Sequence, residues 1–438
     1  MYKLHWATSI VLSTLLFSGF SVAHATSASV ETPTIPSSGD ADDPAVWLNP
    51  TDASKSLIIT SVKNAGLRVY DLAGNQIQSY LPGKIGGQSS RLNNVDVQYN
   101  FKMADGSRAD LAIFSERGQD GLRVFKIDGS NATSPLTEIT SFNRTFPNIP
   151  VANQSTAYGL GLWRDAANDK LYSLVAQRGG SGANGYEKGH SIAQFEMIAN
   201  ADGTVTSQLV NSWSLPTTYK GVNLLGGGLD STGVVYNPQS EGLVIDQQTG
   251  IAYVGQEDVG IWGIDLKSGS LSGVPLVETK NFNPISPITP DVEGLTIRYG
   301  ENGEGVIIAS SQGDSTFAAF NRKDFSYLGS FSITGNGTID GVQHSDGADV
   351  TSFGLPGFED GIFITQDGED NGVAAGSTNF KYVKWSDIVA ANPFLAPYGK
   401  TPVGFDPRNI PALTVPEPET SAMLLVGVGL LSMRRRKA

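Results

Sequence analysis

An acidic motif that runs directly into an apolar, strand-like segment recurs six times along the chain, and this recurrence limits the folds open to it. The motif is clearest at Asp40–Trp47, where three aspartates in four positions precede an apolar run. In five of the six copies an acid lies at or near the start of the strand, and in the third a tyrosine takes that place. The other copies begin at Asn93, Ala157, Ser240, Asp291 and Ser345. Six equivalent strands around one axis would bring these acids together as a ring.

A second repeat supports this arrangement. The segment 66–74 is echoed by 121–129, 55 residues later. Weaker echoes follow at intervals of 55 to 70 residues, with anchors at Tyr70, Phe125, Phe195, Ile264, Phe320 and Lys384. With 51 glycines and only 17% charged residues, the composition suits many short strands joined by tight turns. A repeat of this length with several strands per unit predicts an all-β fold, a six-bladed β-propeller.

Both ends of the chain carry export features. Residues 1–25 have a basic start, an apolar run and Ala23-His24-Ala25, which is typical of a secretory signal peptide cleaved near Thr26. At the other end Pro416-Glu417-Pro418 precedes an apolar run over 422–433 and four basic residues. Twelve apolar residues are fewer than the ~20 that span a bilayer. We therefore expect a signal peptide over 1–25, a propeller domain over 30–395, a linker over 396–415 and a terminal signal over 416–438.

This C-terminal order resembles the PEP-CTERM sorting signal of Gram-negative bacteria. The resemblance implies that an exosortase recognises Pro416-Glu417-Pro418 and removes the tail during export. The protein would then pass through the membrane transiently and end as a secreted or cell-surface protein.

The charge of the body restricts its partners. Without the two ends that we expect to be processed, it carries 25 basic and 41 acidic residues, a net charge of −16. Such a body repels nucleic acid and anionic lipid. It also repels a phosphorylated substrate, unless bound cations reverse the local field.

Carboxylates are the most abundant side-chain groups in this sequence that could bind a metal or take part in catalysis. The chain has no cysteine, and the body holds only His190 and His344. It contains no nucleophile elbow, no phosphate-binding loop and no complete EF-hand. Oxygen ligands without Cys or His favour Ca²⁺ or Mg²⁺. Acids beside strand ends, such as Asp52, Asp71 and Asp265, are expected to be turn or cap residues instead.

Several motifs, in order, resemble the β-propeller phytases, calcium-dependent phosphatases that act on myo-inositol hexakisphosphate (phytate). The resemblance covers about residues 35–390. Its motifs are Asp40–Trp47, Leu92–Asp96, Ser240–Gly242, Glu257–Trp262, Pro290–Ile297, Ser310–Gly313 and Gln366–Glu369. It implies a six-bladed propeller, in agreement with the repeats, and a 3-phytase-like activity in which metal-activated water attacks the phosphomonoester.

The resemblance also implies roles for individual residues. Several calcium ions would be held by Asp42, Glu241, Glu257, Asp291, Glu293, Asp340 and Asp346. The catalytic set would be Lys63, Arg117, Tyr158 and Glu241, and the phosphate-binding set Lys63, Arg117, Tyr158 and Arg178. Asp43, Asn94 and Asp96 would support the structure or a further cation. Arg178 replaces a lysine that the family often has, and Asn64 replaces a second lysine found in some members.

Two other functions remain open. A lactonase-like calcium propeller needs an axial metal but no basic phosphate clamp, and Lys63 and Arg117 argue against it. A non-catalytic surface propeller would use calcium only for stability. We expect a monomer that acts on a small molecule and binds no nucleic acid.

Overall fold

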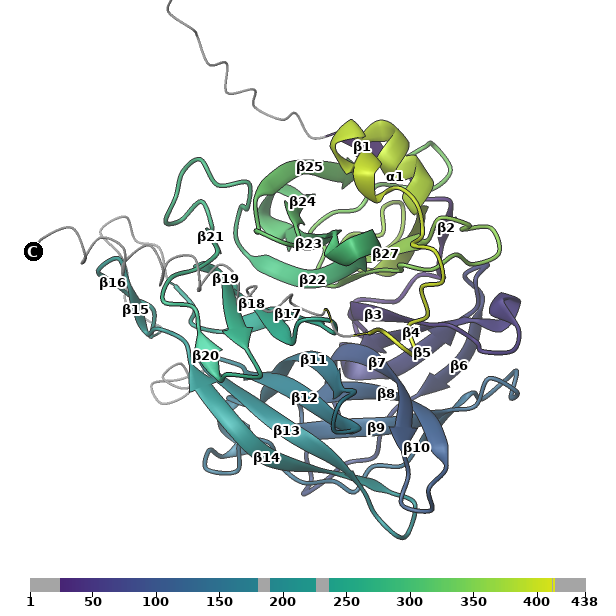
Figure 1. Ribbon diagram of the computed structural model, residues 1–438, viewed down its shortest axis with the longest axis vertical. Helices are drawn as coiled ribbons and strands as arrows, with labels where there is room; N and C mark the ends of the chain where they lie inside the picture. Colours follow the sequence, from purple (N-terminus) through teal and green to yellow (C-terminus); the bar gives the residue numbers. More distant parts are fainter. Residues whose placement is uncertain (1–23, 180–189, 226–235, 412, 414–438) are drawn as a thin grey trace, which may run out of the picture.

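The computed structural model describes residues 24–179, 190–225, 236–411 and 413. The described residues form six sheets of four or five strands and one small two-stranded hairpin, arranged as a six-bladed β-propeller (Figure 1). This confirms the predicted fold. The hairpin pairs β15 (Thr218–Tyr219) with β16 (Val222–Asn223).

The blades are numbered here in chain order, and each begins with its innermost strand. Blade 1 contains β3 (Ala41–Trp47), β4 (Leu57–Val62), β5 (Gly66–Tyr70) and β6 (Gln76–Tyr80). Blade 2 contains β7 (Leu92–Lys102), β8 (Arg108–Glu116), β9 (Gly121–Ile127) and β10 (Leu136–Glu138). Blade 3 contains β11 (Ala157–Asp165), β12 (Lys170–Gln177), β13 (Ser191–Ala199) and β14 (Val205–Ser214).

The second half of the ring repeats this plan. Blade 4 contains β17 (Ser240–Asp246), β18 (Ile251–Gln256), β19 (Gly260–Asp265), β20 (Ser270–Leu271) and β21 (Val277–Glu278). Blade 5 contains β22 (Val292–Tyr299), β23 (Gly305–Ser311), β24 (Thr316–Asn321) and β25 (Tyr327–Ile333). Blade 6 contains β26 (Ala348–Val350), β27 (Ile362–Asp367) and β28 (Asn379–Lys384).

Both predicted repeats correspond to equivalent positions in the blades. The six acidic motifs lie at the starts of the innermost strands β3, β7, β11, β17, β22 and β26, and each of these strands contacts the next around a closed ring. The anchors of the second repeat, from Tyr70 to Lys384, all fall in the third strand of their blades. The acidic starts therefore meet at one end of the axis, which we call the mouth; we call the opposite end the lower face.

The N-terminal segment closes the ring. Strand β2 (Val30–Glu31) pairs with β28 and completes blade 6, so the last blade is built from both ends of the chain. Strand β1 (His24–Thr26) adds to blade 5 by pairing parallel to β25. The predicted signal-peptide cleavage site therefore falls within a paired strand.

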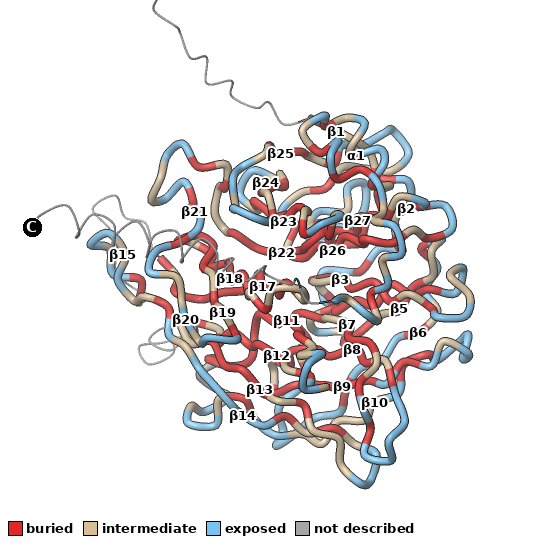
Figure 2. Tube along the Cα trace, viewed as in Figure 1, coloured by how far each residue is buried: buried red, intermediate tan, exposed pale blue. Residues whose placement is uncertain are grey.

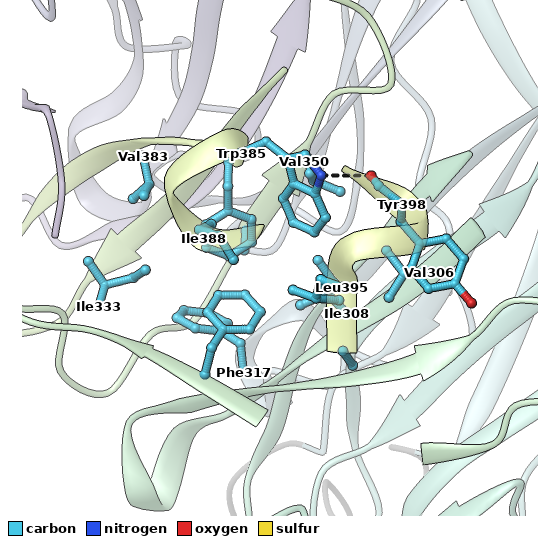
Figure 3. Packing of buried hydrophobic residues seen from close by; sticks show 14 of the residues in the cluster. Val306, Ile308, Phe317, Ile333, Val350, Val383, Trp385, Ile388, Leu395 and Tyr398 are labelled. Atoms are coloured by element: carbon cyan, nitrogen blue, oxygen red, sulfur yellow. Dashed lines mark hydrogen bonds between the residues drawn. The ribbon is translucent and has the colours of Figure 1, made fainter. Parts of the chain in front are cut away.

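Apolar side chains fill the spaces between neighbouring blades. Buried residues follow the strands, and exposed residues follow the loops at the periphery (Figure 2). Between blades 5 and 6, Phe317 and Val383 pack against α1 (Trp385–Ala391) and the 3-10 helix η7 (Pro393–Tyr398) (Figure 3). Trp385 Nε1 donates to the carbonyl of Tyr398 at 2.8 Å. This cluster holds the C-terminal helices onto the propeller.

Short 3-10 helices occupy several turns: η1 (Ala53–Lys55), η2 (Lys63–Ala65), η3 (Val151–Asn153), η5 (Glu301–Gly303) and η6 (Gln312–Asp314). Among the residues that the structure describes, no helix has the length and apolar character needed to cross a membrane. The predicted linker over 396–415 is packed against the propeller through its described residues: Phe405 stacks on Tyr299, and Arg408 lies over Tyr99.

Candidate active site

A local irregularity in the innermost strands brings the ring side chains together at the mouth. The register between the first and second strands shifts near the start of the blade in five cases, between Ala41/Pro44, Leu92/Val95, Ala157/Leu160, Ser240/Leu243 and Val292/Leu295. Each shift inserts a bulge, and a bulge re-aims side chains at the end of a strand. The bulges contain Asp42, Asn93, Tyr158, Glu241 and Glu293 in turn. In blade 6, Asp346 lies two residues before the start of β26.

Glycines after four of these residues allow the strand starts to approach closely. A Cβ on Gly159 would overlap the carbonyl oxygen of Glu241, and a Cβ on Gly242 would overlap that of Glu293. A Cβ on Gly294 would lie 2.8 Å from the carbonyl oxygen of Asp346. The backbones of blades 3, 4 and 5 therefore pack against the backbone of the acidic residue in the next blade, which fixes the spacing of this part of the ring.

Three glutamates form the most compact part of this ring. One carboxylate oxygen from each of Glu241, Glu257 and Glu293 lies within 4.8 Å of the others, and all three residues are buried. Among the described residues, Glu257 Oε1, Glu293 Oε2 and both carboxylate oxygens of Asp42 have no hydrogen-bond partner. Buried oxygens of this kind carry a large desolvation cost unless a cation or proton compensates it.

The pKa values of the acids reflect this crowding. Burial raises the pKa of Glu257 well above its usual value, and the nearby Asp291 and Glu241 raise it further. Burial has the same effect on Asp42, although Lys63 opposes it. The pKa of Glu241 is lowered: burial pushes it upward, but Lys63 and hydrogen bonds from Glu293 and Tyr158 outweigh burial. The ring thus contains one carboxylate held ionised among others that resist ionisation.

Lys63, from the turn between β4 and β5, supplies positive charge at the mouth. Its Nζ lies 2.7 Å from Asp346 Oδ2, 3.4 Å from Asp40 Oδ1 and 3.6 Å from Asp42 Oδ1. Burial lowers the pKa of Lys63, but these carboxylates more than offset it and raise the value well above normal. Lys63 is therefore charged at any physiological pH.

Arg117, Asn93, Tyr158 and Glu241 form a second connected group. Arg117 Nη1 donates to Asn93 Oδ1 at 3.1 Å, and its guanidinium lies 5.2 Å from the centre of the Tyr158 ring. Asn93 Nδ2 and the Tyr158 hydroxyl both donate to Glu241. The predicted clamp residues Arg117 and Tyr158 are thus joined to the acid ring through one glutamate.

Two further arginines border the same region. Burial and the neighbouring Arg117 lower the pKa of Arg178, whose Nη1 donates to Gln154 at 3.0 Å. Arg91 was not identified from the sequence: burial and Arg117 lower its pKa as well, and it contacts Asn64 and Asp40. Arg91 directly precedes Leu92, the first residue of β7, so its position before an innermost strand was the available signal.

Most of the predicted metal ligands are brought together, but Asp340 is not among them. Burial raises the pKa of Asp291 to about 6, and the nearby carboxylates of Asp258, Glu241 and Asp346 add to this effect. Asp340 instead forms a separate group with Glu31 and Asp370, whose ligand oxygens lie within 4.8 Å of one another. The ammonium of Lys381 contacts both Glu31 and Asp340 there. Sequence order alone did not distinguish these two acidic groups.

Asp43 and Asp96 lie further along the axis and join adjacent blades. Asp43 Oδ2 accepts from the Val95 backbone N–H at 3.0 Å, and Asp96 Oδ2 accepts from that of Leu162 at 2.8 Å. In blade 6, Asp349 Oδ2 accepts from the Val46 backbone N–H at 3.0 Å. These contacts support the structural role expected for Asp43 and Asp96.

The donor set at the mouth fits a hard divalent cation. It offers carboxylate oxygens from several blades, some of them unpaired and buried, and the described residues add no thiolate or imidazole. Ca²⁺ takes six to eight oxygen ligands in flexible geometry, whereas Mg²⁺ demands a near-ideal octahedron. The donor set is therefore one that Ca²⁺ or Mg²⁺ can use.

Comparison with known proteins identifies relatives of this chain. A phytase family profile matches residues 4–225 and 228–408, and a PEP-CTERM protein-sorting motif matches residues 414–437. The chain is 36% identical over 369 residues to a 3-phytase of Bacillus subtilis (strain 168), covering 82% of this chain and 84% of that protein. Among solved structures, a computationally designed protein, Ika8, covers 77% of this chain at 10% identity with a TM-score of 0.33, which is too low to support an argument.

Proposed function

The chain belongs to the phytase family, and from this membership we propose that it is a calcium-dependent phytase of the 3-phytase type, which hydrolyses phosphomonoester bonds of phytate. The family match by itself supports a hydrolase that acts on phosphate esters. The finer proposal depends on one observation: the buried glutamates Glu241, Glu257 and Glu293 converge with unpaired oxygens beside fixed positive charges.

We assign the cation ligands to Asp42, Glu241, Glu257, Asp291, Glu293 and Asp346. Calcium bound there would supply positive charge to the phosphate oxygens and activate the attacking water. Asp340 is left to the separate group with Glu31 and Asp370. Because burial resists ionisation of several ring acids, bound cations are needed to keep the whole ring charged.

The basic residues have a distinct role, which is to hold the phosphate. Arg117 presents a planar guanidinium that can bind two phosphate oxygens, and Lys63 contributes a point charge. Tyr158 orients Glu241 through its hydroxyl and lies under the Arg117 guanidinium. Arg178 extends the positive field from blade 3. No protein nucleophile is required, because phosphoryl transfer depends mainly on positioning and charge stabilisation.

The four basic residues at the mouth, Lys63, Arg91, Arg117 and Arg178, favour this function over the two alternatives. We call them the phosphate clamp. A lactone carries no dianion, so a lactonase has no need of four basic groups directed at an acidic mouth. A non-catalytic propeller likewise gives no role to Lys63, Arg117 and Arg178 gathered beside one acid ring. This grouping therefore favours a phosphate-binding site.

The C-terminal motif indicates an exported protein directed to the cell surface. We further propose a Gram-negative source, removal of a signal peptide near Thr26, exosortase processing of the tail, and a monomeric propeller domain over 30–395.

Calcium titration of phytate hydrolysis tests the proposal. Chain stripped of calcium should be inactive and regain activity as Ca²⁺ is added. Glu241→Gln should need more Ca²⁺ and recover in part. Arg117→Ala should lose about 30- to 1000-fold in rate, because a preorganised charged contact is worth about 2–4 kcal/mol in the transition state. Added Ca²⁺ should not rescue it.

Arg108→Ala is the matched control, since Arg108 pairs with Asp169 on the lower face. All variants should be checked for folding by circular dichroism. Full activity without calcium would contradict the calcium assignment. A folded Arg117→Ala with near-normal activity would contradict the clamp, and hydrolysis of lactones but not phytate would favour the first alternative.

A further inference from the structure

The C-terminal segment crosses the lower face of the propeller, at the opposite end of the axis from the mouth. Phe405 stacks on Tyr299 with ring centroids 5.6 Å apart, and the Arg408 guanidinium lies 4.6 Å from the Tyr99 ring centre. Arg408 Nη2 also pairs with Asp110 at 3.1 Å. We call residues 402–411 the strap. It joins blades 2 and 5, so it runs across the axis instead of hanging from one blade.

The last described residue is fixed on the same face. The backbone N–H of Leu413 donates to the carbonyl of Gln248 at 3.1 Å, just after the end of β17. Glu241 lies near the start of that strand. Seven strand residues at ~3.3 Å each separate the two ends by roughly 20 Å. The chain therefore leaves the propeller from the end opposite to the acid ring.

The sequence that follows gives a short tether. Eight residues, 414–421, lie between Leu413 and the apolar run that begins at Ala422. Even fully extended, the nine Cα–Cα steps from Leu413 to Ala422 reach at most ~32 Å. An apolar run embedded in a bilayer thus holds Leu413 within that distance of it.

This tether is too short to let the propeller rotate until its mouth faces the bilayer. To place the mouth against the bilayer, the tether would have to pass around one blade. Four strands have three gaps of ~4.8 Å, which add about 14 Å outward, and the strand length adds roughly 20 Å upward, before the loops and the outermost side chains are counted. Even this minimum path of about 34 Å exceeds the reach of the tether.

We infer that, while its tail is embedded in a bilayer, the protein faces that bilayer with its lower face and presents the mouth to water. The inference concerns orientation on a lipid surface and depends on the sorting motif, not on phytase activity. The turns of the lower face mix exposed acids and bases, such as Asp52 paired with Lys55 and Glu304 paired with Lys323, so they form no basic patch that would draw this face to anionic lipid. The tail alone therefore sets the orientation.

The absence of cysteine makes a direct test straightforward. Single cysteines at Ala104 and Lys84 would lie in exposed turns on either side of β7, on the lower face and near the mouth respectively. Each variant starts at Thr26, so that the apolar run of the expected signal peptide is absent, and extends to Ala438. It is labelled with a donor fluorophore and reconstituted into phosphatidylcholine vesicles containing an acceptor-labelled lipid headgroup. We expect clearly greater energy transfer from Ala104→Cys than from Lys84→Cys.

Two controls identify the tether as the cause. A chain ending at Leu413 should not bind the vesicles. Insertion of about 20 Gly and Ser residues after Leu413 should remove the difference between the probes, because the flexible tether then reaches around a blade. Equal or reversed transfer in the chain that ends at Ala438, a difference that persists in the extended chain, or failure of the chain that ends at Ala438 to bind vesicles would overturn the inference. None of these readouts involves hydrolysis, so they are independent of the proposed function.

Discussion

Aspartates at the two ends of the blades experience opposite environments. At the lower face, Asp52 and Asp128 accept hydrogen bonds from Ser54 and Ser130, and these bonds lower their pKa values. At the mouth and along the axis, burial raises the pKa values of Asp42 and Asp96. The first kind stabilises turns in the ionised form. The buried aspartates ionise only at a free-energy cost, which a bound cation can offset.

Arg91 offers a prediction at the scale of one side chain. It lies beside Arg117 but contacts Asn64 and Asp40. We therefore expect its guanidinium to bind a second phosphate next to the one being cleaved. Arg91→Ala should raise KM for phytate by about 10- to 100-fold, the range of one charge-assisted hydrogen bond. KM for a monophosphate ester should change little. Steady-state kinetics with both substrates measure the difference.

Arg108→Ala again serves as the control for removal of an arginine. If Arg91→Ala raises KM for both substrates equally, Arg91 acts on the shared phosphate site or on folding. If neither KM changes, Arg91 makes no contact with substrate.

The side chains of the site were predicted unevenly from the sequence. Asp52, Asp71 and Asp265 were expected to be turn residues, and each accepts backbone hydrogen bonds within its own turn. Glu241 and Glu293 were selected because their motif recurs. Asp340 could not be separated from Asp346, six residues later, because only the folded ring shows that Lys381 lies beside one and Lys63 beside the other.

At the scale of elements, the bulge and its glycine set the geometry of the ring. The order Glu-Gly-Leu occurs at both 241–243 and 293–295. Gly242→Ala should destabilise the fold by about 1–3 kcal/mol, because the added methyl group overlaps the Glu293 backbone in a packed site. It should also weaken calcium binding, since Glu293 must move. Chemical denaturation and calcium titration measure the two effects.

Gly83→Ala provides the comparison, because a Cβ at Gly83 has nothing within 4 Å. Its stability and calcium affinity should stay near those of the parent chain. A Gly242→Ala variant that behaves like Gly83→Ala would show that the strand starts are not tightly packed.

The elements differ in how far local sequence determines them. The innermost strands and third strands were predictable because they repeat. The strap was predicted as part of a linker, since its contacts with Tyr99 and Tyr299 exist only after blades 2 and 5 have come together. The pairing of β1 and β2 with the last two blades is likewise a long-range contact that no local pattern encodes.

At the scale of the whole molecule, a body of charge −16 is closed around a carboxylate ring. Calcium that binds only the folded chain stabilises it by about 2.7 kcal/mol at a hundredfold excess over Kd. Without calcium, the buried acids control how stability depends on pH. The stability of the calcium-free chain should fall as pH rises, whereas exposed aspartates with lowered pKa values make stability rise with pH.

Asp96 shows the sign and the size of the effect. Burial raises its pKa to about 7 from the usual 3.8. Below pH ~4 the carboxyl is protonated in both the folded and unfolded chains, so this contribution is fully present. As pH rises from ~4 to ~7, the unfolded chain releases the proton while the folded chain retains it, and stability falls. The shift corresponds to roughly 4 kcal/mol.

We therefore expect the melting temperature of calcium-stripped chain to fall between pH 5 and pH 8, and that of calcium-loaded chain to hold or rise, because cation ligands must be ionised. Asp96→Asn should flatten the calcium-free profile, since the amide occupies the same space without a proton to lose. Asp128→Asn, in an exposed turn, should leave it unchanged above pH 5, because hydrogen bonds keep the pKa of Asp128 below its usual value. A calcium-free melting temperature that rises across this range would show that the axial acids are already compensated within the protein, and that calcium is not needed to hold the ring together.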